Sequence, residues 1–139
     1  MFRRLNFLLW MSLLLSSCSP SSLEDFHYEG KVRCRALIEE LQTIHNREDL
    51  TRALPRLKKH FNELVDLMID AREFQEKHSD EEAMPDFAEN SISSLLEQEL
   101  RRIYAIDGGR EIIESAQHEA LVRLDAFERA CIKKRQSIR

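Results

Sequence analysis

Apolar residues recur at steps of three and four along most of the chain from about residue 31 onward. Residues with this spacing share one face of an α-helix, so the pattern indicates amphipathic helices. Four such stretches follow one another. Their apolar positions are Cys34, Leu37, Ile38, Leu41 and Ile44 in the first; Leu50, Leu54, Leu57, Phe61, Leu64, Met68 and Ala71 in the second; Ile92, Leu95, Leu96, Leu100, Ile103 and Tyr104 in the third; and Ile113, Ala116, Ala120, Leu124, Phe127 and Cys131 in the fourth.

The residues between these stretches are typical of helix ends. The segment 46–49 offers a helix stop and a new N-cap, 79–85 is an acidic loop, and 107–109 contains the two glycines of a chain reversal. Pro55 lacks an N–H, so we expect a break or kink near Leu54, unless the first helix runs on to that point. Short loops favour antiparallel neighbours, so the predicted fold is an all-α, four-helix up-and-down bundle. The alternative is a three-helix bundle with a peripheral segment.

Composition supports helices and argues against one class of partner. The chain of 139 residues has only three Gly and three Pro, whereas turn-rich β folds use many more. Its net charge is −4, and without the first 17 residues, which contain Arg3 and Arg4, 19 basic residues face 25 acidic ones, for a net charge of −6. Because nucleic acids are bound by basic surfaces, we expect no nucleic-acid partner.

The first 18 residues, MFRRLNFLLWMSLLLSSC, have the pattern of a secretory signal. Arg3 and Arg4 are followed by an apolar run, from Phe7 to Leu15, of about nine residues. Such a run is too short to cross a bilayer core of ~30 Å as a helix. The small residues Ser16 and Ser17 then lead to Cys18.

The segment Leu15-Ser16-Ser17-Cys18 resembles the lipobox of bacterial lipoproteins. That resemblance implies a diacylglyceryl group on the thiol of Cys18, cleavage before this residue, and usually an acyl chain such as palmitate on the new amino terminus. We therefore expect a signal peptide over 1–17, a lipidated cysteine with a flexible tether over 18–29, and a helical domain over 30–139. The alternatives are a plain signal peptide with an incidental cysteine, or an uncleaved signal anchor.

The resemblance also predicts a location on the bacterial cell membrane. Three acyl chains hold a protein on a bilayer far more firmly than one chain does. In diderm members of this class, aspartate after the lipidated cysteine favours retention in the inner membrane. Position 19 is Ser, so the outer membrane, facing the periplasm, is favoured if the source is diderm.

Two further cysteines offer a test of topology. Cys34 and Cys131 lie on the apolar stripes of the first and fourth helices, and an envelope protein folds in an oxidising compartment. In an up-and-down bundle the start of the first helix lies beside the end of the fourth. We therefore predict a Cys34–Cys131 disulfide, with two separate buried thiols as the alternative.

No pattern of residues indicates catalysis or a metal centre. Metal sites in helical bundles repeat ligands at i, i+3 or i, i+4 on two helices. The pairs here, Glu114 with His118, His60 with Glu63, and Glu24 with His27, form no such repeat. Serine-nucleophile and phosphate-loop motifs are also missing. Asp107-Gly108-Gly109-Arg110 could hold an anion before a helix, but a helix–helix turn explains it equally well. We predict no catalytic residue, metal or cofactor.

The basic C-terminus stands out on this acidic chain. Lys133, Lys134 and Arg135 could contact anionic lipid head groups, a cell-wall polymer or an acidic partner. The alternative is that cations simply stabilise a helix C-terminus.

The function expected from these observations is that of a membrane-anchored, non-enzymatic interaction or structural protein of the cell envelope, with an envelope protein as its partner. One alternative is a small-ligand or metal carrier with a pocket in the bundle. Another is a hydrolase of envelope polymers, which would need carboxylates such as Glu97, Glu99, Glu111 and Glu114 to gather in a cleft.

Overall fold

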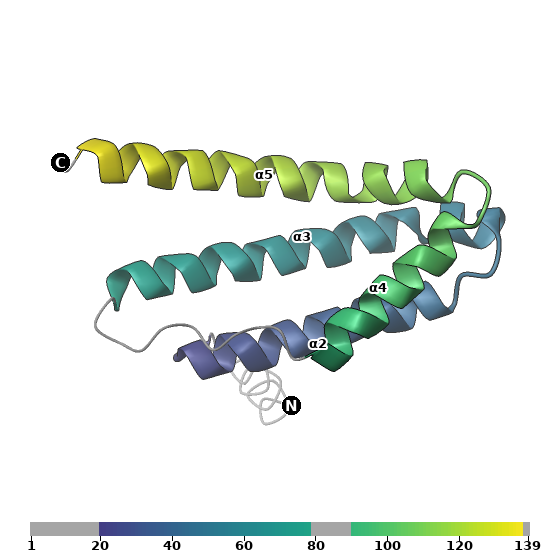
Figure 1. The fold of residues 1–139 in the computed structure, drawn as a ribbon, viewed down its shortest axis with the longest axis horizontal. Coiled ribbons are helices and arrows are strands. Elements are labelled where there is room, and N and C mark those ends of the chain that lie inside the picture. The colour runs from purple at the N-terminus through teal and green to yellow at the C-terminus, as the bar shows by residue number, and fades with distance from the viewer. Residues whose placement is uncertain (1–19, 79–89, 138–139) are drawn as a thin grey trace, which may run out of the picture.

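The computed structural model describes residues 20–78 and 90–137, and of Asn90 the backbone alone. The described chain consists of four helices and contains no strand. They are α2 (Leu23–Gln42), α3 (Arg47–Lys77), α4 (Asn90–Tyr104) and α5 (Gly109–Ser137). Successive helices reverse direction, as Figure 1 shows. The predicted all-α, four-helix bundle is therefore confirmed.

Helix α2 begins earlier than the sequence pattern indicated. We expected helix soon after Gly30 and a flexible tether before it, but α2 already starts at Leu23. The side chain of Ser22 accepts a hydrogen bond from the backbone N–H of Asp25 at 3.1 Å and caps the helix. Phe26 is buried one turn later, so the first turn is also anchored by packing. Residues 23–29 thus belong to the folded domain.

Pro55 does not interrupt α3, and the predicted break near Leu54 was wrong. The helix runs without a gap through 31 residues, and the first helix ends at Gln42 instead of continuing into it. Asn46 is the N-cap, as 46–49 predicted, and its side chain accepts from the N–H of Asp49 at 2.9 Å. Pro55 is exposed, so water can reach the backbone where the proline removes a hydrogen bond, while buried leucines on the opposite face hold the helix together.

The helices form a layer of three with a shorter fourth helix across it. In Figure 1, α3 lies between α2 and α5, and α4 crosses α2 at one end. The packing agrees: α3 contacts both α2 and α5, α4 contacts α2, and no Cα atom of α2 lies within 8 Å of one of α5. Val65 and Leu67, which lie on α3 outside the stripe from Leu50 to Ala71, are also buried, as expected for a helix with a neighbour on each side.

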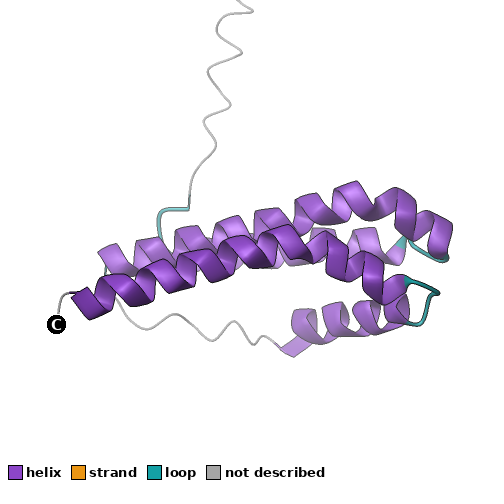
Figure 2. Cartoon of the chain, turned by 90° about the horizontal axis from the view of Figure 1, so that it is seen from above, coloured by secondary structure: helices purple, strands orange, loops and turns teal. Residues whose placement is uncertain are grey.

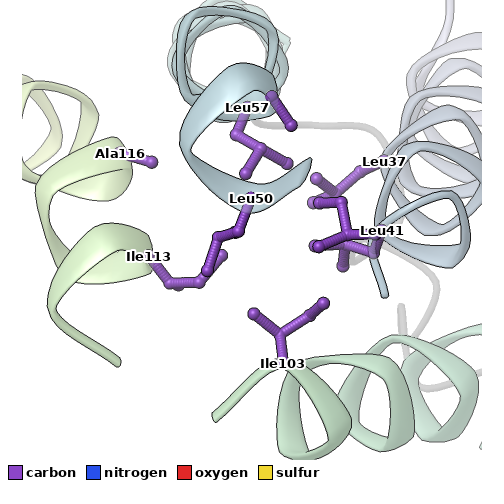
Figure 3. Close-up of a cluster of buried hydrophobic side chains, with 9 residues drawn as sticks. Leu37, Leu41, Leu50, Leu57, Ile103, Ile113 and Ala116 are labelled. Atoms are coloured by element: carbon purple, nitrogen blue, oxygen red, sulfur yellow. The ribbon is translucent and has the colours of Figure 1, made fainter. Parts of the chain in front are cut away.

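Both tight turns, 43–46 and 105–108, lie at the same end of the molecule, which we call the closed end (Figure 2). All four helices contribute to a core there, and Figure 3 shows side chains from each converging. Its buried members are Leu37, Leu41, Ile44, Leu50, Ala53, Leu57, Ile103, Ile113 and Ala116.

The opposite end, which we call the open end, contains the start of α2 and the ends of α3 and α5. Its core is a small cluster of Phe26, Leu67 and Ala71, with Phe74 packed against it. The rings of Phe26 and Phe74 lie 5.5 Å apart and join α2 to α3. The short helix α4 does not extend over this end, as Figure 1 shows, so the core is thinner here.

Candidate functional site

The histidine and carboxylate pairs considered as metal ligands do not come together. Glu114 and His118 are both exposed on α5. On α3, Glu63, the residue paired with His60 in the sequence, forms an ion pair with Lys59 at 3.7 Å. In the part of the chain that the structure describes, no three His, Cys, Asp or Glu side chains are placed so that they could hold a metal ion.

The carboxylates considered for hydrolysis lie on two different helices. Glu97 and Glu99 pair with arginines of their own helix, α4, at 2.6 and 2.8 Å. Glu111 and Glu114 are exposed near the start of α5. The carboxylates of Glu97 and Glu99 are therefore each paired with an arginine of the same helix.

The segment Asp107-Gly108-Gly109-Arg110 is the turn between α4 and α5. Gly108 has φ +70°, a left-handed conformation that glycine adopts at little cost. The N–H of Gly109 donates to the carbonyl of Ile106 at 2.8 Å, and Asp107 accepts from Arg47 at 2.5 Å. The N–H of Gly109 is thus satisfied within the turn, and Asp107 is paired with the start of α3, which favours the structural interpretation over an anion site.

The predicted Cys34–Cys131 disulfide is not formed in the structure, where both cysteines are free. Their helices, α2 and α5, have no Cα atoms within 8 Å of each other, whereas a disulfide needs Cα atoms less than ~7 Å apart. The reason is that α3 lies between the two helices. Cys34 also falls in the middle of α2, because that helix starts at Leu23.

Each cysteine is half-buried in its own surroundings. Burial raises the pKa of the Cys34 thiol above its ordinary value, since the charged thiolate loses hydration. At neutral pH Cys34 is therefore protonated, and it is a weaker nucleophile than an exposed thiol with the ordinary pKa. Cys131 lies in a different place, in the wall of a groove at the open end.

This groove runs between α3 and α5 and has a volume of about 270 Å³. Its half-buried lining residues are mainly apolar, and all of its charged lining residues are exposed. From α3 come Met68, Arg72, Gln75 and Glu76, and from α5 come Leu124, Phe127, Glu128, Cys131, Ile132 and Arg135. We refer to it as the α3–α5 groove. Met68 and Ile132 are each about half exposed, at 51% and 53%.

The groove lies on the helix faces that are buried at the closed end. Eleven residues make three helical turns, so Met68 lies on the same face of α3 as Leu57, which is fully buried. In the same way, Leu124 follows Ile113 on α5. At the closed end these faces meet Ile103 of α4. At the open end the helix that would cover them is missing from the described chain.

The basic residues of the C-terminus lie at the open end. Lys134 lies 3.4 Å from Glu76 of α3, and Arg135 lies 4.0 Å from the same carboxylate. Lys133 is exposed. The three residues thus share one helix end, where two of them have a partner within the chain.

A set of arginines joins the helices, and no pattern in the sequence had indicated them. Arg102 of α4 donates to the carbonyls of Leu41 and Ile44 at the end of α2, each at 2.6 Å. Arg33 donates to a backbone carbonyl of α3, and Arg123 of α5 pairs with side chains of α3. In the sequence these arginines look like ordinary surface cations, and no spacing rule distinguishes them from their neighbours.

The predicted signal peptide, 1–17, and the lipidation site, Cys18, lie outside the described residues. No described helix combines the length and apolar character needed to cross a membrane. No protein-family model matches the chain, and comparisons with curated proteins and with solved structures found no match either. The case for a function therefore rests on the residues of this chain.

Proposed function

We propose that this chain is a lipid-anchored, non-enzymatic protein of a bacterial cell envelope, and that it binds an amphipathic helix of a partner protein in the α3–α5 groove. One observation carries the proposal. Helix α4 packs on the three-helix layer at the closed end, but it does not extend to the open end, where the α3–α5 groove lies uncovered. A half-covered apolar face is typical of a protein that completes its packing with another chain.

The shape of the uncovered face favours a helix as the occupant. The face continues the helical stripe of α3, and at the closed end that stripe is covered by another helix. A partner helix with its own apolar stripe could take the corresponding place, as in helix-in-groove recognition. Arg72 and Glu128 lie at the rim and supply charges of both signs for residues that flank such a stripe.

The same geometry gives less support to a small-ligand carrier. Pockets for such ligands usually enclose the molecule and have volumes of roughly 300–1,000 Å³. The groove is smaller, at about 270 Å³, and half-exposed residues such as Met68 and Ile132 leave it open to solvent.

The anchor is supported by the lipobox-like segment that ends at Cys18. With Ser19 in the next position, the favoured location is the periplasmic side of the outer membrane in a diderm cell. The partner would then be an envelope protein within reach of that membrane.

The anchor is tested by the intact mass of the protein extracted from its native membrane. The expected mass is that of residues 18–139 with a diacylglyceryl group and an acyl chain. A lipid-free chain, or a chain that still carries residues 1–17, would contradict the anchor.

The groove is tested by photo-crosslinking in the native membrane, with a photoreactive residue at Met68 or Ile132. The control position is Leu95, an exposed apolar residue of α4 outside the groove. We expect both groove positions, and not the control, to crosslink to the same apolar stripe of one partner helix. With the photoreactive residue at position 132, the change Met68→Glu should abolish the adduct without unfolding the protein. Equal adducts at all three positions, or a partner segment without helical spacing, would contradict the proposal.

A further inference from the structure

The start of α2 fixes which end of the domain faces the membrane, provided that Cys18 is lipidated as proposed above. Ser22 caps the helix and lies four positions after Cys18 in the sequence. Even a fully extended chain of four residues spans only about 14 Å. The open end, where α2 begins, therefore lies close to the lipid head groups.

The C-terminal part of α5 is held at the same end by contacts through α3. The ring of Phe74, near the end of α3, packs on Phe26 in the first turns of α2. Two residues further on, Glu76 pairs with Lys134 of α5. Figures 1 and 2 both show α5 ending at the same end of the molecule at which α2 begins.

The last turns of α5 have the chemistry of a surface that binds anionic lipid. From residue 129 to residue 135 there are four basic residues and no acidic one. They are exposed, as is Ile132 among them, which could reach between head groups. Glu76 neutralises part of the charge of Lys134 and Arg135, and Asp125 pairs with Arg129 one turn earlier on α5.

We propose that the C-terminal turns of α5, with Lys133, Lys134 and Arg135, bind the anionic head groups of the membrane that holds the lipid anchor. This second attachment fixes the orientation of the domain. It also places the α3–α5 groove, which Arg135 and Ile132 line, beside the bilayer. A partner helix would then be met at the membrane surface.

The test is amine-reactive labelling of the full lipidated protein in vesicles, with each lysine read out by mass spectrometry. One set of vesicles contains phosphatidylcholine alone, and the other contains a quarter phosphatidylglycerol. Lys59 is a matched control for Lys134: its side chain is 74% exposed and lies 3.7 Å from Glu63, against 68% and 3.4 Å from Glu76.

We expect labelling of Lys133 and Lys134 to slow by about fivefold in the anionic vesicles, which corresponds to the attraction of roughly one basic residue to such a surface. High salt should restore the rate, and Lys59 should not change. If the protein floats with both kinds of vesicle and Lys134 labels equally in both, the second attachment is refuted while the anchor stands. A protein that does not float with either refutes the anchor itself.

Discussion

The two ends of α3 present the same helix face to different surroundings. Leu57 and Met68 lie three turns apart on that face, yet Leu57 is fully buried and Met68 is 51% exposed. Leu57 belongs to a core cluster to which α4 contributes Ile103, whereas α4, with 15 residues against 31 in α3, does not extend over the open end. Periodicity therefore identifies the face of a helix that seeks a neighbour, and the length of the neighbour decides how much of that face is buried.

Because the two ends differ in burial, they should also contribute unequally to the free energy of unfolding. All seven of the largest fully buried side chains belong to the closed-end core. The open end has three buried residues and a half-buried phenylalanine. We expect the closed end to determine the stability of the domain and the open end to tolerate change, which suits a binding surface.

The largest change in stability should come from shortening Leu57, and it should be compared with shortening Met68, which lies on the same face of α3. We expect Leu57→Ala to lower the free energy of unfolding by about 2–5 kcal/mol, because it leaves a cavity. Met68→Ala should change it by about 0.5 kcal/mol or less, as at other surface sites. Urea denaturation followed by circular dichroism measures both, and equal losses would show that the two ends contribute alike.

The next effect should come from Arg102, which joins α4 to the end of α2. Arg102→Ala removes two bonds from a charged donor to backbone carbonyls, and we expect a loss of about 1.5–3 kcal/mol. Arg101→Ala is the control, since Arg101 makes an exposed ion pair with Glu97 that is worth roughly 0.3–0.5 kcal/mol. The same denaturation curves give the comparison, and similar losses for both variants would reject a special role for Arg102.

Replacing glycine by alanine should have opposite signs at two positions. At Gly109 an added Cβ would lie 2.0 Å from the carbonyl oxygen of Ile103, so we expect a loss of about 1–3 kcal/mol from overpacking. At Gly30, inside α2, the nearest atom would be Cδ2 of Leu67 at 3.7 Å. There the helical preference of alanine should raise stability by about 0.5–1 kcal/mol. Melting temperatures that fall for both variants would contradict this prediction.

The smallest effect is a dependence on pH at the open end. Hydrogen bonds from the backbone N–H and the hydroxyl of Ser21, and then from Ser22, hold the pKa of Asp25 below its ordinary value of 3.8. Because the folded pKa is the lower one, this contribution is complete above pH 3.8 and is lost as the pH falls through the folded pKa. We expect the first turn of α2 to fray in that acidic range.

The fraying can be followed by NMR through the amide of Ser21. In the control variant Asp25→Asn, the side chain keeps an acceptor oxygen and does not titrate, so its Ser21 signal should stay constant over the same range. An identical titration in both variants would assign the change to another group.

Much of the fold could be predicted from the sequence, because helical faces and caps are local features. The heptad spacing from Leu50 to Ala71 predicted α3, and Asn46 was identified as part of its start. The start of α2 was missed because Ser22 and Phe26 stand before the regular stripe. The predicted break at Pro55 was wrong, because the burial of residues before and after this exposed proline stabilises the helix by more than one lost hydrogen bond costs.

The candidate site was less predictable, because it depends on how the helices are arranged. The apolar stripe that includes Met68 was visible in the sequence. The sequence did not indicate how far along this stripe α4 would extend. The disulfide prediction assumed that the first and last helices of a bundle touch. Here α3 lies between them, and that arrangement follows from apolar positions on several sides of α3, such as Val65 and Leu67.

The bonds from Arg102 to α2 have a consequence for the order of folding. The Arg102 side chain that donates to the carbonyl of Ile44 comes 58 residues later in the chain, and it also gives the carbonyl of Leu41 a second donor beside the N–H of Ile44. The α2–α3 hairpin is formed by neighbours in sequence and can assemble early, while contacts of long sequence separation form slowly. We expect a short-lived intermediate in which this hairpin exists and α4 has not yet docked. In a cell, a chain delayed at that stage would expose the apolar side chains that α4 later covers to chaperones and proteases. The time that the 15-residue helix α4 takes to dock would then set how long the new protein is open to proteolysis.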